Sequence, residues 1–312
     1  MRFKVLITEK IHESGINLLR ENDVDVILLY EGRSKIEEAI KEVDGVIVRV
    51  TRLGRELLET GKKHRLKVIA KHGIGVDNID LEAARDLGIR VVYVPEAVVN
   101  AVAEHTIGLI LLMAKRFMEY DRAVRSGNWE IKYEKENLEL KGKVLGIIGF
   151  GRIGKAVASL ARCFGMRILV YDPYAEAIEP SIKRVSLEEL LENSDFVSIH
   201  CPLTRETYHL LGEEELKRMK KTAYLINTAR GGIVDEEALC KLIRVGKIAG
   251  AALDTIEEEP PNPRNPILSC PNVVLTAHTA GSTSQALKTM SFLAAKQILQ
   301  VLRGEKPKYA LI

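Results

Sequence analysis

KGKVLGIIGFGRIGKAVA, residues 141–158, joins a short apolar run, a turn with three glycines and a helical pattern. Gly149 permits a tight turn, Gly151 removes a side chain that would block a phosphate group, and Gly154 lets the helix pack closely on the strand. The free N–H groups at the start of such a helix, together with its partial positive charge, attract phosphates. This stretch therefore predicts a dinucleotide-binding turn in the middle of the chain.

The next apolar run, RILVYD, ends in Asp172, 23 residues after Gly149. A carboxylate at this place binds the hydroxyls of the adenosine ribose and repels a 2′-phosphate. No lysine or arginine follows before Lys183, so we expect NAD rather than NADP as the cofactor. Arg152 and Ile153 open the predicted helix and are expected to contact the cofactor as well.

Length and composition indicate a globular protein of two domains. The 312 residues are 46% hydrophobic and 29% charged, and a chain of this length usually divides in two. The net charge of +3 excludes the strong basic field typical of nucleic-acid binding. No apolar run reaches the length of a membrane span, and the N-terminus lacks the apolar core of a signal peptide. The four cysteines are widely spaced, which favours free thiols in a reducing cytoplasm over disulfides or a metal site.

The order of apolar runs and helical patterns predicts two α/β layers. In the first hundred residues, strands are expected at 4–8, 25–29, 45–50, 67–71 and 90–94. Residues 100–127 predict one long helix, so apolar in its first half that it must be covered by both domains or by another subunit. Further strands are expected at 144–148, 167–171, 196–200, 223–227, 249–253 and 273–276, with helices at 152–164, 187–193, 213–219, 236–245 and about 283–303. Such alternation is typical of parallel sheets.

Polar residues follow three of the predicted strands in the second series. Arg230, Asp254 and His278 each come shortly after an apolar run. In an open α/β sheet, ligands bind outside the carboxyl ends of the strands. We therefore expect these three side chains to lie along one edge of the sheet.

Six segments of the chain together resemble the D-isomer-specific 2-hydroxyacid dehydrogenase family. They are HGIGVDNID (72–80), NAVAEHTIGLIL (100–111), GIIGFGRIG (146–154), NTARGGIVDEEAL (227–239), EEEPP (257–261) and TAHTAGST (276–283). The resemblance implies an oxidoreductase with two Rossmann-like or flavodoxin-like domains, in which the cofactor domain is inserted into the substrate domain. Residues 1–98 and 285–312 would then form the substrate domain, and residues 99–284 the NAD-binding domain.

The family's catalytic arginine, glutamate and histidine correspond by resemblance to Arg230, Glu259 and His278. His278 would take the hydroxyl proton as the alcohol is oxidised. A glutamate beside it would favour the imidazolium, and Arg230 would hold the substrate carboxylate through two parallel hydrogen bonds. The residues alone do not separate Glu257, Glu258 and Glu259, but the family's acid directly precedes the proline, which favours Glu259.

The resemblance also implies ligand contacts in both domains, and no metal. The cofactor contacts would be Gly149, Gly151, Arg152, Ile153, Gly154, Asp172, Pro202, Thr207, Thr228, Ala229, Asp254, His278 and Gly281. The substrate contacts would be Arg49, Ile74, Gly75, Asn100, Arg230 and His278.

The expected substrate follows from finer features of the sequence. The segment TAHTAGST resembles the 3-phosphoglycerate dehydrogenases most, and Arg49 and Lys71 are candidates to meet a phosphate. We therefore expect oxidation of 3-phosphoglycerate to 3-phosphohydroxypyruvate, which opens serine biosynthesis. A glyoxylate, hydroxypyruvate or D-lactate reductase is the alternative enzyme, and an NAD-sensing scaffold or corepressor is the alternative without catalysis.

The expected partners are few. The resemblance implies a homodimer or larger homo-oligomer through the helix at 100–120, with neither a nucleic acid nor a membrane as partner. The chain ends soon after its last predicted helix, so we expect no C-terminal serine-sensing domain.

Overall fold

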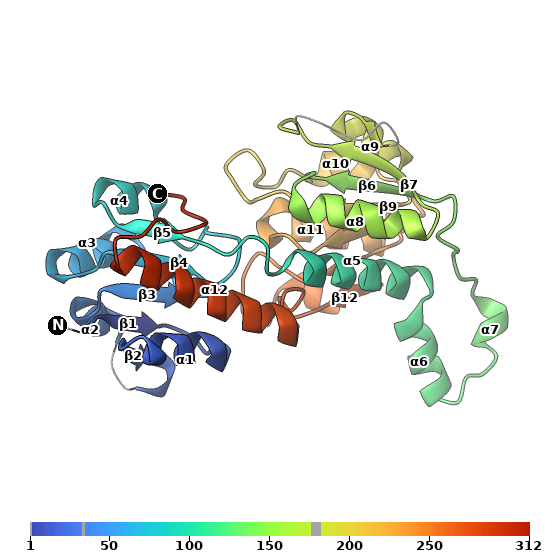
Figure 1. Cartoon of the computed structure of the whole chain (residues 1–312). Helices are drawn as coiled ribbons and strands as arrows, with labels where there is room; N and C mark the ends of the chain where they lie inside the picture. The colour runs from blue at the N-terminus through green and yellow to red at the C-terminus, as the bar shows by residue number, and fades with distance from the viewer. Residues whose placement is uncertain (1, 33–34, 176–181) are drawn as a thin grey trace. The chain divides into compact units, whose positions relative to one another are not determined.

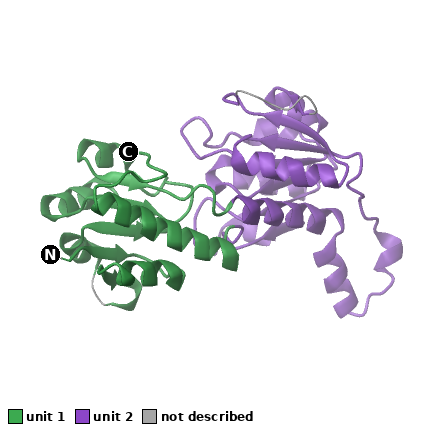
Figure 2. Cartoon of the chain, in the orientation of Figure 1, with its two compact units in different colours: residues 1–98, 281–312 green, residues 99–280 purple. Residues whose placement is uncertain are grey.

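The computed structural model describes residues 2–32, 35–175 and 182–312 (Figure 1). Its contacts divide the chain into two compact units (Figure 2). Unit 1 comprises residues 1–98 and 281–312, and unit 2 comprises residues 99–280. Unit 1 is therefore built from both ends of the chain. None of the helices in the described ranges combines the length and the apolar composition that a membrane span needs.

Unit 1 is a five-stranded parallel sheet in the order β2-β1-β3-β4-β5. Its strands are β1 (Lys4–Ile7), β2 (Asp25–Leu28), β3 (Gly45–Val48), β4 (Val68–Lys71) and β5 (Arg90–Val92). Its helices are α1 (Glu13–Glu21), α2 (Ile36–Ala39), α3 (Arg55–His64), α4 (Leu81–Asp86) and α12 (Ser284–Leu302), with 3-10 turns η1 (Leu29–Glu31) and η2 (Ile40–Glu42). This is the flavodoxin-like strand order.

The alternation of side chains along the strands explains why both faces of this sheet are covered. In β3, Ile47 packs with residues of α1 and α12, whereas Val46 and Val48 pack with residues of α3 and α4 on the other face. Successive side chains of a strand point to opposite faces, so a strand buried on both sides reads as a continuous apolar run. The five strands predicted from such runs are confirmed.

Unit 2 is a seven-stranded parallel sheet in the order β12-β11-β10-β9-β6-β7-β8. Its strands are β6 (Val144–Ile148), β7 (Arg167–Tyr171), β8 (Lys183–Arg184), β9 (Phe196–Ile199), β10 (Tyr224–Asn227), β11 (Gly250–Leu253) and β12 (Val273–Leu275). Its helices are α5 (Val99–Ala114), α6 (Phe117–Arg125), α7 (Ile131–Glu134), α8 (Arg152–Cys163), α9 (Leu187–Asn193), α10 (Glu213–Arg218) and α11 (Glu236–Arg244), with η3 (Gly231–Ile233) and η4 (Pro266–Ser269). Helices α5 and α8 cover one face, and α9, α10 and α11 cover the other.

The predicted fold class, two parallel α/β units with one inserted into the other, is confirmed. The prediction of one long helix over residues 100–127 is wrong, because the chain breaks at Arg116 into α5 and α6. Arg116 has a left-handed backbone, with φ of 51°, and its guanidinium binds the Glu119 carboxylate at 3.0 Å. This turn ends the apolar helix before the polar one begins.

Candidate active site

The glycine turn connects β6 to α8 as the sequence predicts. Gly149 has φ of 90°, and a Cβ there would overlap the backbone of His200 and Cys201, where β9 has just ended. Gly151 forms the N-cap of α8 without any side-chain hydrogen bond, and a Cβ at this residue would meet open space. The first N–H groups of α8 therefore lack a side-chain cap, which is the arrangement that fits a diphosphate.

Asp172, just past the end of β7, lies against this turn. One carboxylate oxygen accepts the backbone N–H of Phe150 at 2.7 Å, and the other accepts that of Tyr174 at 2.8 Å. The carboxylate is thus held beside the glycines, where a ribose would follow the diphosphate. In the loop after β9, the Thr207 hydroxyl donates to the Pro202 carbonyl at 2.6 Å, so these two predicted cofactor contacts lie together.

Three neighbouring strands, β10, β11 and β12, carry Arg230, Asp254 and His278 to the same edge of the sheet. Asn227, buried at the end of β10, shapes the loop that bears Arg230. Its amide donates to the Arg230 carbonyl at 2.8 Å and accepts the N–H of Ala229 at 3.0 Å. The predicted convergence at the carboxyl edge is therefore present within unit 2.

His278 is paired with a glutamate. Its Nδ1 lies 2.8 Å from Oε2 of Glu259, and both side chains are about two-fifths exposed. The His278 backbone is left-handed, with φ of 52°, a conformation that costs free energy in a residue other than glycine. Its N–H donates to the Asp254 carbonyl at 2.8 Å.

Asp254, expected to contact the cofactor, has a buried carboxylate that holds the loop after β12. It accepts the Thr276 hydroxyl at 2.6 Å and the N–H groups of Thr279 and Ala280 at 2.8 and 2.9 Å. These bonds flank His278 on both sides, so the Asp254 carboxylate maintains the unusual backbone that presents the imidazole.

The three adjacent glutamates differ in their partners. Glu259 meets His278, Glu257 binds His209 Nε2 at 2.6 Å, and Glu258 is exposed. The sequence does not predict the contact of Glu257 with His209, nor its contact with Glu236, whose carboxylate accepts the Glu257 N–H at 2.5 Å. Neither contact has a signal in the sequence, because the partners are 48 and 21 residues apart.

In unit 1, the predicted substrate arginine lies at the point where the strand order reverses. Glu9 follows β1 and Arg49 follows β3, and ligands bind at such a switch point in flavodoxin-like sheets. The Glu9 carboxylate accepts the N–H groups of Arg49, Val50 and Thr51 at 2.8, 3.1 and 2.6 Å. Burial raises the pKa of Glu9, but the hydrogen bonds from Thr51, Thr8 and these N–H groups outweigh it and lower the pKa.

Lys71 does not present its charge as the sequence suggested. It is buried, and its Nζ donates to the Arg49 carbonyl and to Asn78 Oδ1, each at 2.5 Å. The lysine therefore supports the loop that bears Arg49. Ile74 and Gly75 lie half-buried in the loop after β4, on the strand next to β3.

The remaining predicted ligand contacts are divided between the units. Asn100 is exposed near the start of α5 and belongs to unit 2, with Arg230 and His278. Gly281, predicted to contact the cofactor, belongs to unit 1. Thr228 is buried in unit 2, and its hydroxyl lies 3.0 Å from that of Thr106 in α5.

Comparison with known proteins agrees with this geometry. Residues 107–280 match the family of the D-isomer specific 2-hydroxyacid dehydrogenase, NAD binding domain. The chain belongs to the D-isomer specific 2-hydroxyacid dehydrogenase family. It is 42% identical to a glyoxylate reductase of Thermofilum pendens, over 98% of this chain and 93% of that protein. It is 43% identical to a D-3-phosphoglycerate dehydrogenase of Methanocaldococcus jannaschii, over 97% of this chain but 58% of that protein. The TT0316 protein of Thermus thermophilus has a similar structure, with a TM-score of 0.89 and 37% identity over 99% of this chain and all of that one.

Membership of the D-2-hydroxyacid dehydrogenase family confirms three predictions: the family itself, the oxidoreductase class and NAD as the cofactor. The residues present fit NAD, because the glycine turn, the uncapped start of α8 and the Asp172 carboxylate follow one another along the carboxyl edge. Among the described residues, no group of three or more histidine, cysteine or carboxylate side chains could hold a metal ion.

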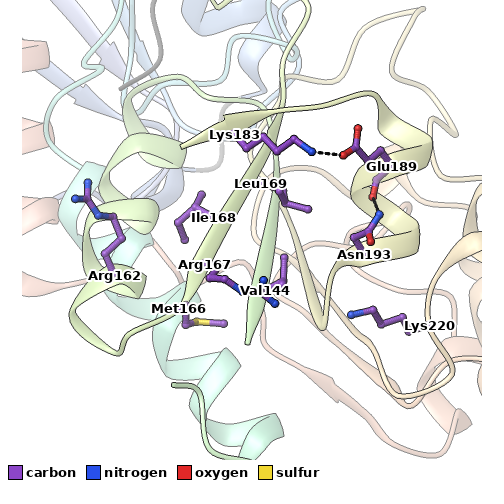
Figure 3. A pocket seen from close by; sticks show the side chains of 10 residues that line it. All are labelled: Val144, Arg162, Met166, Arg167, Ile168, Leu169, Lys183, Glu189, Asn193 and Lys220. Atoms are coloured by element: carbon purple, nitrogen blue, oxygen red, sulfur yellow. Dashed lines mark hydrogen bonds and ion pairs between the residues drawn. The ribbon is translucent and has the colours of Figure 1, made fainter. Parts of the chain in front are cut away.

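A cleft of about 590 Å³ lies on the side of the unit 2 sheet where the strands begin (Figure 3). It lies at the amino ends of β6, β7 and β8, away from the glycine turn. Two of its cations are paired: Lys183 binds Glu189 at 2.6 Å, and Lys220 binds Asp195 at 2.9 Å. This cleft therefore has no part in the chemistry of His278.

Proposed function

We propose that this D-2-hydroxyacid dehydrogenase uses Arg230, Glu259 and His278 to interconvert a D-2-hydroxy acid and its 2-oxo acid. The observation that supports this most is the 2.8 Å contact between His278 Nδ1 and Glu259 Oε2, at the carboxyl edge of a sheet with an NAD-binding turn. NAD, when bound, supplies the acceptor for the two electrons that leave the substrate carbon.

His278 provides the proton transfer. With Nδ1 bonded to Glu259, its Nε2 is the atom left to accept the substrate hydroxyl proton. The imidazolium that forms is stabilised by the adjacent carboxylate, which also fixes the orientation of the ring. In the reducing direction, the same Nε2 donates the proton to the carbonyl oxygen.

The binding of the acid is assigned residue by residue in each unit. The planar guanidinium of Arg230 can bind a carboxylate through two parallel hydrogen bonds and draw charge from the 2-oxygen. In unit 1, we assign substrate binding to Arg49, fixed by Glu9, and to the backbone N–H groups of Ile74 and Gly75. Asn100 is assigned to the same substrate from unit 2.

The substrate we propose first is 3-phosphoglycerate, whose oxidation opens serine biosynthesis. Arg49 and Arg52 place two cations in one loop of unit 1, and a D-3-phosphoglycerate dehydrogenase is among the relatives, at 43% identity. Glyoxylate is the second candidate, because a glyoxylate reductase is equally similar and Val50, beside Arg49, exposes an apolar side chain that carries no hydrogen-bonding group for a phosphate.

An enzyme assay separates these candidates. The purified protein is assayed with 3-phosphoglycerate and NAD, and with glyoxylate or pyruvate and NADH. We expect the largest kcat/KM with 3-phosphoglycerate. If only glyoxylate is turned over, the first substrate is rejected while the dehydrogenase chemistry stands. If no 2-hydroxy or 2-oxo acid is turned over, the proposed function is rejected.

We also propose a homodimer through the α5–α6 region. Phe117, Met118 and Val124 expose apolar side chains on α6, which a second copy of the chain would cover. Sedimentation should give a dimer, and a Phe117→Glu variant should shift the protein towards the monomer. A monomeric wild type would contradict this assignment.

A further inference from the structure

We propose that Glu236 is a positioning residue for the reaction: its buried carboxylate clamps the loop of residues 256–265, and thereby keeps Glu259 on His278. The inference rests on the proposed function, since it assumes that the Glu259–His278 pair performs the proton transfer. Glu236 itself is the first residue of α11 and acts only through the loop.

The contacts of Glu236 tie down the loop at both ends. One carboxylate oxygen accepts the backbone N–H of Glu257 at 2.5 Å, and the other accepts the Asn265 side-chain amide at 2.9 Å. Glu259 lies between these two anchor points. Since Glu236 is 5% exposed, both bonds are shielded from water.

The burial of this carboxylate is unfavourable in itself, so the two donors that it accepts are what explains its presence. Burial raises the pKa of Glu236, against the bonds from Asn265 and the Glu257 N–H, and the nearby charges of Glu257 and Glu259 raise it further. A neutral side chain would avoid these costs. A carboxylate, which only accepts hydrogen bonds, is the side chain that satisfies two donors at once.

Two further contacts bring the same loop against the segment that carries Arg230. A Cβ at Gly231 would overlap the backbone of Ile256 and Glu257, so the two segments touch directly. His209 binds the Glu257 carboxylate through its side chain and the Gly232 carbonyl through its N–H at 2.8 Å. These contacts place the loop that carries Glu259 directly against the segment that carries Arg230.

A double-mutant cycle tests whether Glu236 acts through Glu259. In Glu236→Gln, the amide N–H₂ of the new side chain faces the donor of Asn265, so one anchor is lost. We expect kcat to fall about tenfold with the KM for NAD unchanged. In a Glu259→Gln background, the same substitution should cost less than about twofold. Equal losses in the two backgrounds would overturn the proposal.

A double variant that restores the lost hydrogen bond provides the second test of the clamp. In the double variant Glu236→Gln with Asn265→Asp, the glutamine amide donates to the new carboxylate, which can still accept the Ile267 N–H that Asn265 accepts at 3.0 Å. Both anchors are restored, and the negative charge now lies on residue 265 instead of residue 236. We therefore expect kcat to return to within about threefold of the wild type. Failure of this variant to recover, when its thermal unfolding matches the wild type, would contradict the clamp. Glu237→Gln, exposed one residue further along α11, is the matched control and should leave kcat unchanged.

Hydrogen exchange gives a measurement that needs no turnover. The amide protons of the non-proline residues in 256–265 should exchange about tenfold faster in Glu236→Gln than in wild type or Glu237→Gln. If they exchange at the same rate, the clamp is refuted whatever the activity. If they exchange faster while the wild type turns over no 2-hydroxy acid, the clamp stands and the proposed function fails.

Discussion

Replacing Glu259 with glutamine should slow the reaction without weakening cofactor binding. The substitution keeps the size of the side chain and removes the negative charge 2.8 Å from His278 Nδ1. A hydrogen bond to a charged group contributes about 1.5–3 kcal/mol. The two side chains are 43% and 38% exposed, so solvent screening favours the lower half of this range. A loss of about 1.5–2 kcal/mol corresponds to a fall in kcat of about 10- to 30-fold.

The assay for Glu259→Gln is steady-state NADH formation with the best 2-hydroxy acid, together with a fluorescence titration of NADH. Glu258→Gln is the matched control, because it removes the neighbouring charge from the same loop and should leave kcat within about twofold. If Glu259→Gln retains the kcat of the wild type, or if Glu258→Gln loses as much, the pairing of Glu259 with His278 does not serve the proton transfer.

Three other outcomes are expected. Asp172→Asn should lower the kcat/KM ratio of NAD to NADP by about 10- to 100-fold, because the repulsion of the 2′-phosphate is removed; an unchanged ratio would contradict the ribose assignment. Burial lowers the pKa of His72 from 6.5 to about 4. As the pH falls below about 6.5, the unfolded chain therefore binds a proton at His72 before the folded chain does. The free energy of unfolding should then fall by about 1.4 kcal/mol per pH unit between about pH 6.5 and about pH 4. Urea unfolding at several pH values should show a smaller slope for His72→Gln than for the wild type, and equal slopes would refute the assignment. Gly231→Ala should lower both kcat and the free energy of unfolding, the latter by about 1–3 kcal/mol, because a Cβ there would overlap the backbone of Ile256. A stable, active Gly231→Ala protein would contradict this close approach.

The alternation of apolar runs and helical patterns along the chain is sufficient to predict the two sheets. The strand over 144–148 is an apolar run buried on both faces, and its end at Gly149 follows from the turn. The strand β8 was not predicted, because Lys183–Arg184 is a two-residue edge strand without apolar residues. The break at Arg116 also lacks a signal, since neither proline nor glycine marks it and only the left-handed backbone ends α5.

Contacts between distant residues limited the prediction of the site. The strand ends alone indicate that Arg230 and His278 lie at the same side of the sheet. The family resemblance adds Glu259 and the catalytic roles of all three residues. The roles of Lys71 and Glu257 depend on which donor or acceptor the fold places beside them. Lys71 meets the Arg49 carbonyl and Glu257 meets His209, and both pairs are set by packing rather than by spacing.

The most direct measurement is the stereochemistry of turnover by the wild type and by His278→Ala. The D and L enantiomers of one 2-hydroxy acid are incubated with NAD, and NADH formation is followed by absorbance. We predict that the wild type oxidises the D enantiomer alone, and that His278→Ala binds NADH normally but forms almost none. Equal oxidation of the L enantiomer, or undiminished NADH formation by His278→Ala, would contradict the assignment of this chain's chemistry to the imidazole at position 278.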